Sequence, residues 1–536
     1  MLFRSRHLTV ERNELLNAFP PKKLSVCLEE LASRVVNTYS DAEVSGIAWD
    51  SRKVQPGDVF FALVGESVDG HRYIPQAIEK GAAAVVGTQP GLELAVPYVQ
   101  ITGDDRIALA QFASAFYGHP SRKLIVIGIT GTDGKTTTTN LVYHILKVAG
   151  LAVGMISTVN AVIGDETLDT GFHVTTPESP DIQRYLAHMV AAGLNHVVLE
   201  TTSHGLAQQR VAEVDYDLAA VTNVTHEHLD YHRTYQGYLE AKGLLFEALS
   251  KSRGELKQAT PLALLNKDDD SYPYLSKITQ VRQLAYSVQE ETDLWADEIE
   301  NTPSELRFRV HGPGKTFSIR TPLIGRYNVS NGLAALGLTV FGLNIPVEIA
   351  QEAFATVSVV PGRMEAINLG QDFLAIVDFA HTPNGIRQAL RTARELAEGK
   401  LIAVFGSAGL RDVEKRKMMP EIAAGIADEI ILTAEDPRTE SLEGILADMA
   451  EGAVRGGGTE GETFWREPDR GTAIRKAVAK AGKGDVVIIC GKGHEQSMCF
   501  GTVEYPWDDR TALQAALAEL LNQNGPEMPD LPTSPK

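Results

Sequence analysis

Uninterrupted apolar runs mark the middle of the chain. The longest covers residues 124–130, and shorter runs follow at 197–199 and 218–221. Runs without polar alternation are typical of strands buried on both faces of a sheet. Helix-like stretches separate these runs, and such alternation predicts a parallel sheet covered by helices. We place this central domain at residues 123–358.

The N-terminal part repeats the pattern on a smaller scale. Apolar runs at 59–64 and 83–86 predict strands, the first of them directly after a turn signal. The turn-forming residues at 117–120 punctuate the chain before the central domain begins. We therefore expect a small N-terminal α/β domain at residues 1–122.

The C-terminal part predicts a second doubly wound sheet. Its apolar runs lie at 374–378, 401–405 and 486–490, again separated by helix-like stretches. We expect a Rossmann-like domain at residues 359–521, so the fold class is α/β with three domains. Residues 522–536 contain four prolines and few apolar side chains, and this composition predicts a disordered tail.

Two further stretches differ from the alternating pattern. Residues 284–324 are rich in β-type and charged residues and predict an antiparallel appendage. Residues 331–350 are the most apolar long stretch, but Asn331, Asn344, Pro346 and Glu348 interrupt it. Too few consecutive apolar residues remain to span a bilayer, so we expect a buried helix there.

Composition narrows the function classes. The 536 residues include 50 lysines and arginines against 69 aspartates and glutamates, a formal net charge of −19, which disfavours a general nucleic-acid binder. The three cysteines Cys27, Cys490 and Cys499 form no CxxC pair, so neither a disulfide framework nor a four-cysteine zinc site is expected. Residues 1–20 lack the apolar core of a signal peptide. We expect a cytoplasmic monomer without membrane segments.

A glycine-rich loop follows the first central strand and precedes a helical stretch. Residues 128–138 contain Gly131, Gly134, Lys135 and Thr136 in the context of a P-loop, although the strict GxxxxGK[ST] spacing is not met. Glycines let backbone N–H groups approach phosphate oxygens, and the helix N-terminus adds a positive field. Lys135 would reach the β- and γ-phosphates, and the Thr136 hydroxyl would ligate Mg²⁺. The sequence therefore predicts binding of ATP or GTP.

A histidine cluster suggests a different chemistry. His226, His228, Asp230 and His232 resemble the HxHxDH site of metallo-β-lactamases, but the last histidine comes one residue late. On an extended segment, a slip of one residue turns a side chain to the opposite face, so these ligands would not converge on one ion. A metallohydrolase would also leave the nucleotide loop unexplained. Some of these histidines are expected to be loop residues bonded to backbone.

Seven stretches resemble motifs of the Mur ligase family, in the family's order. They are residues 128–138, 200–206, 222–232, 240–242, 325–331, 361–365 and 378–383. The resemblance covers nearly the whole chain. Within the family, residues 50–52, 69–71, 175–177 and 491–495 point to the branch that adds the third residue to UDP-N-acetylmuramoyl-L-alanyl-D-glutamate.

The resemblance implies an ATP-dependent ligase of peptidoglycan-precursor synthesis that works through an acyl phosphate and releases ADP. Carboxylate and γ-phosphate repel each other, so Mg²⁺ and cationic side chains must neutralise them. By the same resemblance, the catalytic residues are Lys135, Glu200, His228 and Lys242. The metal site comprises Thr136, Glu200, His228 and Lys242, the lysine as a carbamate that converts a cationic stem into a carboxylate.

Two larger sets of binding residues follow from matching the motifs. The ATP-binding set is Gly131, Thr132, Asp133, Gly134, Lys135, Thr136, Thr137, Asn328, Arg363, Asp378 and His381. The set for the UDP substrate is Ser51, His71, Thr175, Thr176, Thr202, Gln208 and Arg210. The chain departs from the family pattern at Asp133, which usually is asparagine, and at Thr202, which usually is serine.

A third set would read the added amino acid. It consists of Arg411, Glu435, Asp436, Pro437, Arg438, Gly491 and Glu495. Family members that add diaminopimelate carry Asp-Asn-Pro-Arg where this chain has Glu-Asp-Pro-Arg. The Arg438 guanidinium suits the distal carboxylate of meso-2,6-diaminopimelate, which lysine and ornithine lack. Glu495 would pair with the distal ammonium.

Several alternatives stay open. The extra negative charge at Glu435 and Asp436 could favour the more cationic lysine or ornithine. Folylpolyglutamate or cyanophycin synthesis would be another branch of the superfamily, but the motifs at 50–52 and 175–177 argue against both. A catalytically silent nucleotide-binding regulator would have the same fold. The presence of Lys135, Glu200 and Lys242 argues against this loss of catalytic activity.

Overall fold

The structure is a computed structural model that describes residues 19–65, 68–158, 160–164, 166–168, 176–225, 229–251, 257, 259–302, 304–358 and 360–535. The chain divides into two compact units. The first comprises Met1–Gly128, Ala152–Asp217 and Ala248–Pro261, and the second comprises Ile129–Leu151, Leu218–Glu247 and Leu262–Lys536.

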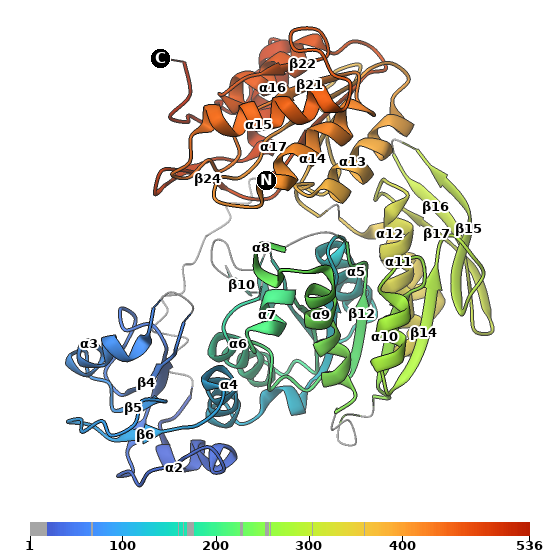
Figure 1. Ribbon diagram of the computed structural model, residues 1–536. Coiled ribbons are helices and arrows are strands. Elements are labelled where there is room, and N and C mark those ends of the chain that lie inside the picture. The colour runs from blue at the N-terminus through green and yellow to red at the C-terminus, as the bar shows by residue number, and fades with distance from the viewer. Residues whose placement is uncertain are drawn as a thin grey trace. The chain divides into compact units, whose positions relative to one another are not determined.

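The N-terminal domain is built on a parallel sheet of order β3-β4-β5-β6 (Figure 1). Its elements are β1 (Lys22–Lys23), α2 (Leu24–Cys27), β2 (Glu43–Val44), β3 (Gly46–Ala48), β4 (Asp58–Ala62), α3 (Ile74–Glu79), β5 (Ala84–Gly87), β6 (Tyr98–Gln100) and α4 (Asp105–Phe116). Side chains of β4 alternate between two apolar clusters, with Val59 and Phe61 in the cluster of α4 and Phe60 and Ala62 in that of α3. The strands expected from the runs at 59–64 and 83–86 are confirmed.

The central sheet has the order β10-β9-β8-β11-β7-β12-β13-β14-β15-β16-β17. Its strands are β7 (Ile125–Thr130), β8 (Val153–Ile156), β9 (Ala161–Ile163), β10 (Glu166–Leu168), β11 (His196–Glu200), β12 (Leu218–Val221), β13 (Leu262–Asn266), β14 (Arg282–Ser287), β15 (Leu294–Asn301), β16 (Leu306–Gly312) and β17 (Lys315–Thr321). The helices are α5 (Lys135–Val148), α6 (Ser179–Ala191), α7 (Ser203–Ala207), α8 (Leu229–His232), α9 (Tyr235–Leu249), α10 (Tyr272–Ile278), α11 (Tyr327–Leu336) and α12 (Val347–Thr356). The three predicted central strands are thus present as β7, β11 and β12.

Two expectations for this region are refined. Strands β15, β16 and β17 are antiparallel, as predicted for 284–324, but β14 pairs in parallel with β13 and β15. The stretch 331–350, expected as one buried helix, contains the end of α11, a π-helical turn (Gly337–Gly342) and the start of α12. The break falls where Asn344 adopts a positive φ of 58° and Pro346 precedes α12. Proline lacks the N–H that would continue a helix from the preceding turn.

The C-terminal domain has a sheet of order β18-β19-β23-β20-β21-β22, parallel except for β18. Its strands are β18 (Glu365–Ile367), β19 (Leu374–Asp378), β20 (Leu401–Phe405), β21 (Glu429–Leu432), β22 (Phe464–Arg466) and β23 (Val486–Cys490), and a hairpin pairs β24 (Ser497–Phe500) with β25 (Val503–Pro506). The helices are α13 (Pro383–Leu396), α14 (Val413–Ala424), α15 (Leu442–Arg455), α16 (Arg470–Lys480) and α17 (Asp509–Leu520).

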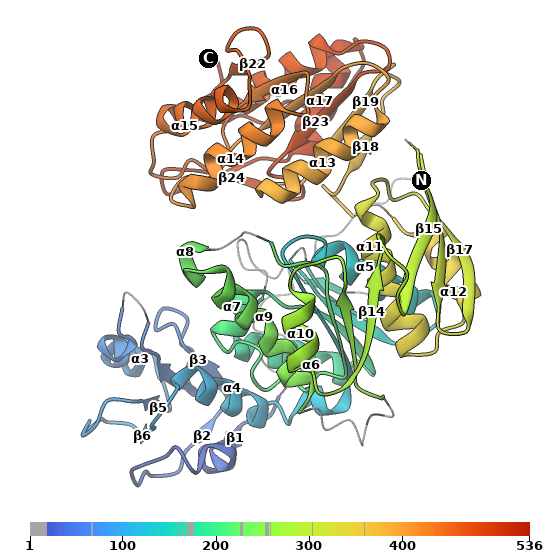
Figure 2. The ribbon, with the colours of Figure 1, turned by 45° about the vertical axis from the view of Figure 1, so that its right-hand side comes forward.

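Helices cover both faces of this sheet, as a doubly wound fold requires (Figure 2). Ala403 and Phe405 of β20 pack in one apolar cluster with α13, α14 and α15. The alternate residues Ile402 and Val404 pack in a second cluster with α16 and α17. Continuous apolar runs are therefore buried on both faces, which is why the sequence pattern predicted these strands correctly.

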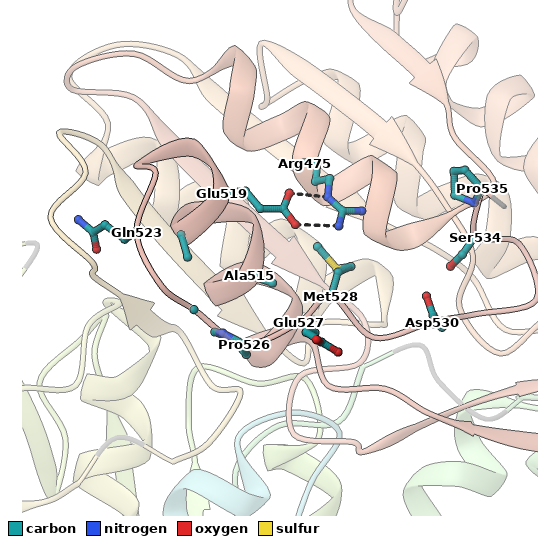
Figure 3. A pocket seen from close by; sticks show the side chains of 12 residues that line it. Arg475, Ala515, Glu519, Gln523, Pro526, Glu527, Met528, Asp530, Ser534 and Pro535 are labelled. Atoms are coloured by element: carbon teal, nitrogen blue, oxygen red, sulfur yellow. Dashed lines mark hydrogen bonds and ion pairs between the residues drawn. The ribbon is translucent and has the colours of Figure 1, made fainter.

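The C-terminal tail differs from the disorder that its composition predicts. Leu531 is 6% exposed and belongs to the apolar cluster of α16 and α17, against which Met528 also packs. The hydroxyls of Thr533 and Ser534 donate to Asp469 at 3.1 Å each. Figure 3 shows tail residues Met528, Asp530 and Ser534 around a surface hollow that Arg475 and Glu519 also line. Two apolar side chains and two hydroxyls thus hold the tail against its domain.

The part of the chain that the structure describes contains no helix long and apolar enough to cross a membrane.

Candidate active site

The nucleotide loop is the turn from β7 into α5. Gly131 has a φ of 148°, and a Cβ there would lie 1.8 Å from the Oγ1 of Thr222, so this position requires glycine. Gly134 has a φ of 84° and directly precedes the first turn of α5. The N-terminus of this 14-residue helix carries a partial positive charge that attracts anions. The glycine-rich loop therefore lies between a strand and a helix, as the sequence predicts, and its binding of phosphate stays a prediction.

The segment after β12 holds this loop in place. The N–H of Thr132 donates to the carbonyl of Asn223 at 2.7 Å, and the N–H of Asp133 donates to the Asn223 Oδ1 at 3.0 Å. The Thr222 Oγ1 donates to the carbonyl of Asp133 at 2.6 Å. Sequence reasoning matched Thr222 and Asn223 to a family motif without giving them a role. Their signal was a polar pair directly after a buried strand.

Two residues of the ATP-binding set, Lys135 and Thr136, begin α5, and a third, Arg363, contacts one of them. The Lys135 Nζ donates to the carbonyl of Thr132 at 2.7 Å, so the lysine curls back over its own loop. Thr136 is 3% exposed, and the Nη2 of Arg363 lies 3.3 Å from its Oγ1. The Arg363 guanidinium also lies 4.4 Å from the centre of the Phe379 ring, a cation–π contact.

Asp133, the departure from the family pattern, contacts the N-terminus of α13. Its Oδ2 accepts from the Nδ2 of Asn384 at 2.8 Å, and its Oδ1 accepts from the Oγ1 of Thr382 at 3.4 Å. Thr382 caps α13 by accepting from the N–H of Gly385. A carboxylate at a helix N-terminus is favourably placed relative to the helix dipole.

The other members of this set lie close to the loop or to Arg363. The Asn328 Oδ1 accepts from Asn331, whose own Oδ1 would lie 2.3 Å from a Cβ at Gly134. Asp378 accepts from the backbone N–H groups of Met364 and Ala380 at 2.8 Å each, and burial raises its pKa. Thr137 is 6% exposed and lies in the first turn of α5.

His381 lies beside Phe379 with its ring centre 4.4 Å away, and its Nδ1 is 2.9 Å from the Phe379 carbonyl. Burial, together with the cations Lys415 and Arg363, lowers the pKa of His381 well below its usual value. The imidazole is therefore neutral at pH 7 and can donate through Nδ1 and accept through Nε2.

Lys242 projects from α9 toward the nucleotide loop and is 1% exposed. Its Nζ donates to the carbonyl of Gly131 at 2.6 Å and lies 4.4 Å from the centre of the Tyr238 ring. The hydroxyl of Tyr238 is in turn 3.1 Å from the Oγ1 of Thr132. Lys242 is thus buried against the glycine-rich loop and does not lie on a solvated helix face.

Glu200 ends strand β11 in the other compact unit and is 1% exposed. Its carboxylate accepts from the N–H of Thr158 at 3.1 Å and from the Thr158 Oγ1 at 2.9 Å. Carboxylate oxygens are ligands that suit a hard cation such as Mg²⁺. Among the residues that the structure describes, no group of three or more histidine, cysteine, aspartate or glutamate side chains could hold a metal ion. His228 lies outside the described residues.

The residues expected along the muramoyl-dipeptide path form one network in the same unit as Glu200. The hydroxyls of Thr176 and Thr202 are 2.9 Å apart, and Thr202 caps α7. Arg210 donates to the carbonyl of Thr176 at 2.8 Å and to the Oε1 of Gln208 at 2.7 Å, and it pairs with Glu178 at 3.1 Å. Thr175 lies outside the described residues.

Ser51 and His71 lie in the N-terminal domain and are 6% and 8% exposed. The Ser51 Oγ donates to Gln76 at 2.7 Å. The His71 Nδ1 lies 2.6 Å from Asp69, and its Nε2 accepts from the N–H groups of Thr88 and Gln89 at 3.0 and 3.2 Å. Both ring nitrogens are therefore engaged within the protein, and the imidazole holds the turn at Thr88.

The amino-acid set lies mostly at the carboxyl ends of β21 and β23. Asp436 and Arg438 adopt positive φ values of 40° and 54°, which non-glycine residues rarely do. The β24–β25 hairpin holds this backbone: the N–H of Cys499 donates to the Asp436 Oδ1 at 2.9 Å, and the N–H of Arg438 donates to the Cys499 carbonyl at 3.0 Å. Backbone strain of this kind is typical of functional sites.

A buried lysine, Lys492, neutralises the extra negative charge that Asp436 brings to this set. Lys492 is 1% exposed, and its Nζ lies 2.9 Å from the Asp436 Oδ1 and 2.5 Å from the Glu495 Oε2. The stretch 491–495 was recognisable from the sequence, but a role for Lys492 was not, because its partner Asp436 lies 56 positions away. The charge added at Asp436 is therefore paired within the protein, and Glu495 has a partner other than substrate.

Glu435 is 8% exposed, and its Oε2 finds no hydrogen-bond partner among the described residues. A Cβ at Gly491, whose φ is 115°, would lie 2.3 Å from this oxygen, so glycine makes room for the carboxyl group. Burial raises the pKa of Glu435 to about 7, against the opposing effect of Arg470. Arg411, by contrast, is exposed, and Pro437 is buried.

Comparison with protein-family models matches most of the chain. Residues 43–117 match the Mur ligase family catalytic domain, residues 129–339 the Mur ligase middle domain, and residues 362–493 the Mur ligase glutamate ligase domain.

Named relatives agree with these matches. The chain is 43% identical to a UDP-N-acetylmuramyl-tripeptide synthetase of Roseiflexus sp., over 89% of this chain and 95% of that protein. It is 41% identical to a UDP-N-acetylmuramoyl-L-alanyl-D-glutamate–2,6-diaminopimelate ligase of Geobacillus thermodenitrificans, over 93% of this chain and 99% of that one. A solved structure of a ligase with the latter name superposes with a TM-score of 0.62 at 28% identity, covering 89% of this chain and 96% of that one.

Proposed function

The chain belongs to the Mur ligase family, and we propose that it joins meso-2,6-diaminopimelate to the D-glutamate carboxylate of UDP-N-acetylmuramoyl-L-alanyl-D-glutamate. Mur ligases are ATP-dependent amide ligases that release ADP, and this chain is such a ligase of peptidoglycan-precursor synthesis. The observation that carries the substrate proposal is the full-length similarity to named diaminopimelate ligases. The arginine at position 438 supports it, because a guanidinium suits a carboxylate.

Activation of the carboxylate requires a bound nucleotide. We propose that ATP lies with its phosphates on the loop from Gly131 to Thr137, with Lys135 neutralising the β- and γ-phosphates. Arg363 is suited to the same task because its guanidinium already reaches Thr136. The remaining residues of the ATP-binding set, Asn328, Asp378 and His381, would form the rest of the nucleotide site.

Magnesium would neutralise charge on the phosphates and polarise the γ-phosphoryl group. The oxygen donors of Thr136 and Glu200 fit this hard cation, since each is buried and one is an anionic carboxylate. We propose that each of them binds Mg²⁺, that Lys242 contributes as a carbamate, and that His228 acts as a further ligand or positions one.

The reaction then has two steps. The D-glutamate carboxylate attacks the γ-phosphorus, the bond to the bridging oxygen breaks, and ADP leaves with the electron pair. The amine of the incoming amino acid attacks the acyl carbon, inorganic phosphate leaves, and the ammonium proton passes to solvent. Cationic side chains at the nucleotide loop stabilise the charge that builds up in the first step.

The UDP substrate would be held in two regions. We propose that Thr176, Thr202, Gln208 and Arg210, together with Thr175, line the muramoyl-dipeptide path. Ser51 and His71 would form the UDP end, His71 through the turn at Thr88 that its imidazole holds.

The residue types of the loop 435–438 also favour diaminopimelate. Arg438 can grip the distal carboxylate with two parallel hydrogen bonds, and lysine and ornithine offer no such group. The extra negative charge of Asp436 does not outweigh this argument, because the Asp436 carboxylate already pairs with Lys492. Glu435, Gly491, Glu495 and Arg411 would complete the pocket. Lysine or ornithine is the second candidate, favoured by the unpartnered oxygen of Glu435.

An omission series tests the ligase function itself. Purified protein receives MgATP, UDP-N-acetylmuramoyl-L-alanyl-D-glutamate and diaminopimelate, and each component is left out in turn while ADP is measured. ADP should appear only with the complete mixture, together with a product of tripeptide mass. ADP release without the UDP substrate, or none with any diamino acid, would identify a different enzyme or a silent regulator. Size-exclusion chromatography of the same sample checks our expectation of a monomer.

A further inference from the structure

A fully buried arginine touches the ends of two strands in the C-terminal domain. Arg470, the first residue of α16, is 0% exposed. Its Nη1 donates to the carbonyl of Ala434 at 3.1 Å, and its Nη2 donates to the carbonyl of Cys490 at 2.8 Å. These two carbonyls directly precede Glu435 and Gly491.

The two strand ends are not paired by the sheet itself. Ala434 follows β21 and Cys490 ends β23, and β20 lies between those strands in the sheet order. The backbone hydrogen bonds of the sheet therefore connect β21 and β23 to each other only through β20. Arg470 adds a direct connection between the two loops that begin there, 435–438 and 491–495.

Asp509 fixes the orientation of this guanidinium. The Arg470 Nε and Nη2 donate to its two carboxylate oxygens at 2.7 Å each, and Trp507 donates to the same carboxylate at 2.8 Å. Asp509 is 0% exposed and begins α17. A guanidinium presents its N–H donors in a rigid planar fork, so fixing one edge on Asp509 fixes the donors aimed at the carbonyls.

Stability alone gives a weak reason for such a pair. Removing two charges from water is costly, and apolar side chains of the same volume often stabilise a fold equally well. What apolar side chains cannot supply is donors to two separate carbonyls. The geometry of the contacts therefore points to the placement of the loops.

We propose that Arg470 is a positioning residue for the third substrate: it sets the spacing between the loops 435–438 and 491–495 without touching the diamino acid. This inference rests on the proposed function, in which both loops bind that amino acid. A small displacement of binding groups can cost large factors in rate, so the spacing of these loops would affect affinity and discrimination.

The test compares Arg470→Lys with a matched control, Arg475→Lys. Lysine keeps a positive charge opposite Asp509, but a single ammonium nitrogen cannot span the two carbonyls. Arg475 pairs with Glu519 at 2.6 and 2.8 Å and so joins the same helices, α16 and α17, on their exposed side (Figure 3).

In Arg470→Lys, KM for diaminopimelate should rise about tenfold, with KM for ATP and for the UDP substrate changed less than about twofold. Its preference for diaminopimelate over lysine should fall, and the control should match the wild type.

Amide hydrogen exchange gives a readout that does not depend on catalysis. Peptides covering 435–440 and 491–499 should exchange faster in Arg470→Lys than in the wild type or the control, with the other peptides unchanged. If the lysine variant does not fold, the double variant Arg470→Met/Asp509→Leu removes both buried charges together and carries the same expectations.

The outcomes separate the two proposals. Unchanged exchange in both loops, or equal losses against all three substrates with a lower melting temperature, would overturn the positioning role. A wild-type protein that makes no product with any diamino acid would defeat the proposed function, while the exchange data would still decide whether Arg470 fixes the loops.

Discussion

Lys242 reaches the nucleotide loop with its Nζ 2.6 Å from the carbonyl oxygen of Gly131. The same amine is the proposed site of a carbamate, which forms when neutral lysine adds CO₂ and releases a proton. The first arrangement makes Lys242 a hydrogen-bond donor that fixes the loop, and the second makes it an anionic support for Mg²⁺. The two roles call for opposite charges.

Small molecules can distinguish these roles in a Lys242→Ala variant. Synthesis should fall by at least about a hundredfold, because a group that stabilises transition-state charge is lost, while ATP binding should remain. If the carbamate acts, acetate should restore part of the activity. Rescue by methylammonium in place of acetate would show that the ammonium–carbonyl contact is the true role. Lys251→Ala, at an exposed position after α9, serves as the control.

Glu435 predicts a pH dependence of stability. Burial raises its pKa to about 7, whereas a glutamate in the unfolded chain has a pKa of about 4.3. The folded state therefore binds the proton more tightly, and this contribution to stability is lost as pH rises through 7.

Relative to Glu435→Gln, the wild type should lose up to about 3 kcal/mol of unfolding free energy between pH 5 and pH 8. Urea unfolding at both pH values measures it, with the exposed Glu443→Gln as control. A constant difference between wild type and variant would contradict the raised pKa.

Asp133 places a carboxylate in the loop that would bind phosphates. Its replacement in Asp133→Asn removes a like charge and leaves an oxygen to accept from Asn384. We expect KM for ATP to fall about two- to fivefold, most clearly at low ionic strength. Steady-state kinetics at two salt concentrations measures this. An unchanged or higher KM would mean that the contact with α13 depends on the charge of Asp133.

At the scale of elements, the tail shows how a weak composition signal can mislead. Leu531 packs on α16 and α17, and two tail hydroxyls donate to Asp469, the N-cap of α16. We expect Leu531→Ala to destabilise the C-terminal domain by about 2 kcal/mol, since a buried leucine leaves a cavity. Thermal unfolding measures the loss. Asn524→Ala, at an exposed tail position, should change stability by less than about 0.5 kcal/mol. Equal effects in the two variants would show that the tail does not contribute to the core.

The strands were predictable because burial on both faces leaves a local signature. Residues 401–405, for example, are all apolar, and the structure buries alternate side chains in two different clusters. The tail was not predictable in this way, because two isolated apolar residues decide its packing and their partners lie elsewhere in the chain. The break in the stretch 331–350 was only partly predictable. The sequence shows Asn344 and Pro346, which disfavour a continuous helix, but it does not show the positive φ of Asn344.

At the scale of the whole molecule, the sequence identified residues but not their partners. The motif at 128–138 correctly predicted a loop between strand and helix, and Lys242 was singled out from its family context. The pairs Lys492–Asp436 and Arg470–Asp509 join residues 56 and 39 positions apart, so no local pattern could reveal them. These pairs fix the loops proposed to read the third substrate, which is why the charge argument from Glu435 and Asp436 alone was incomplete.

The central claim is that this ligase adds diaminopimelate. The most direct test is the ratio of kcat/KM values for meso-2,6-diaminopimelate, L-lysine and L-ornithine, measured with saturating MgATP and UDP-N-acetylmuramoyl-L-alanyl-D-glutamate and with products identified by mass. We predict a preference for diaminopimelate of at least about a hundredfold, because the distal carboxylate gains a charge-assisted pair of hydrogen bonds with Arg438. A higher kcat/KM for lysine or ornithine would contradict the assignment.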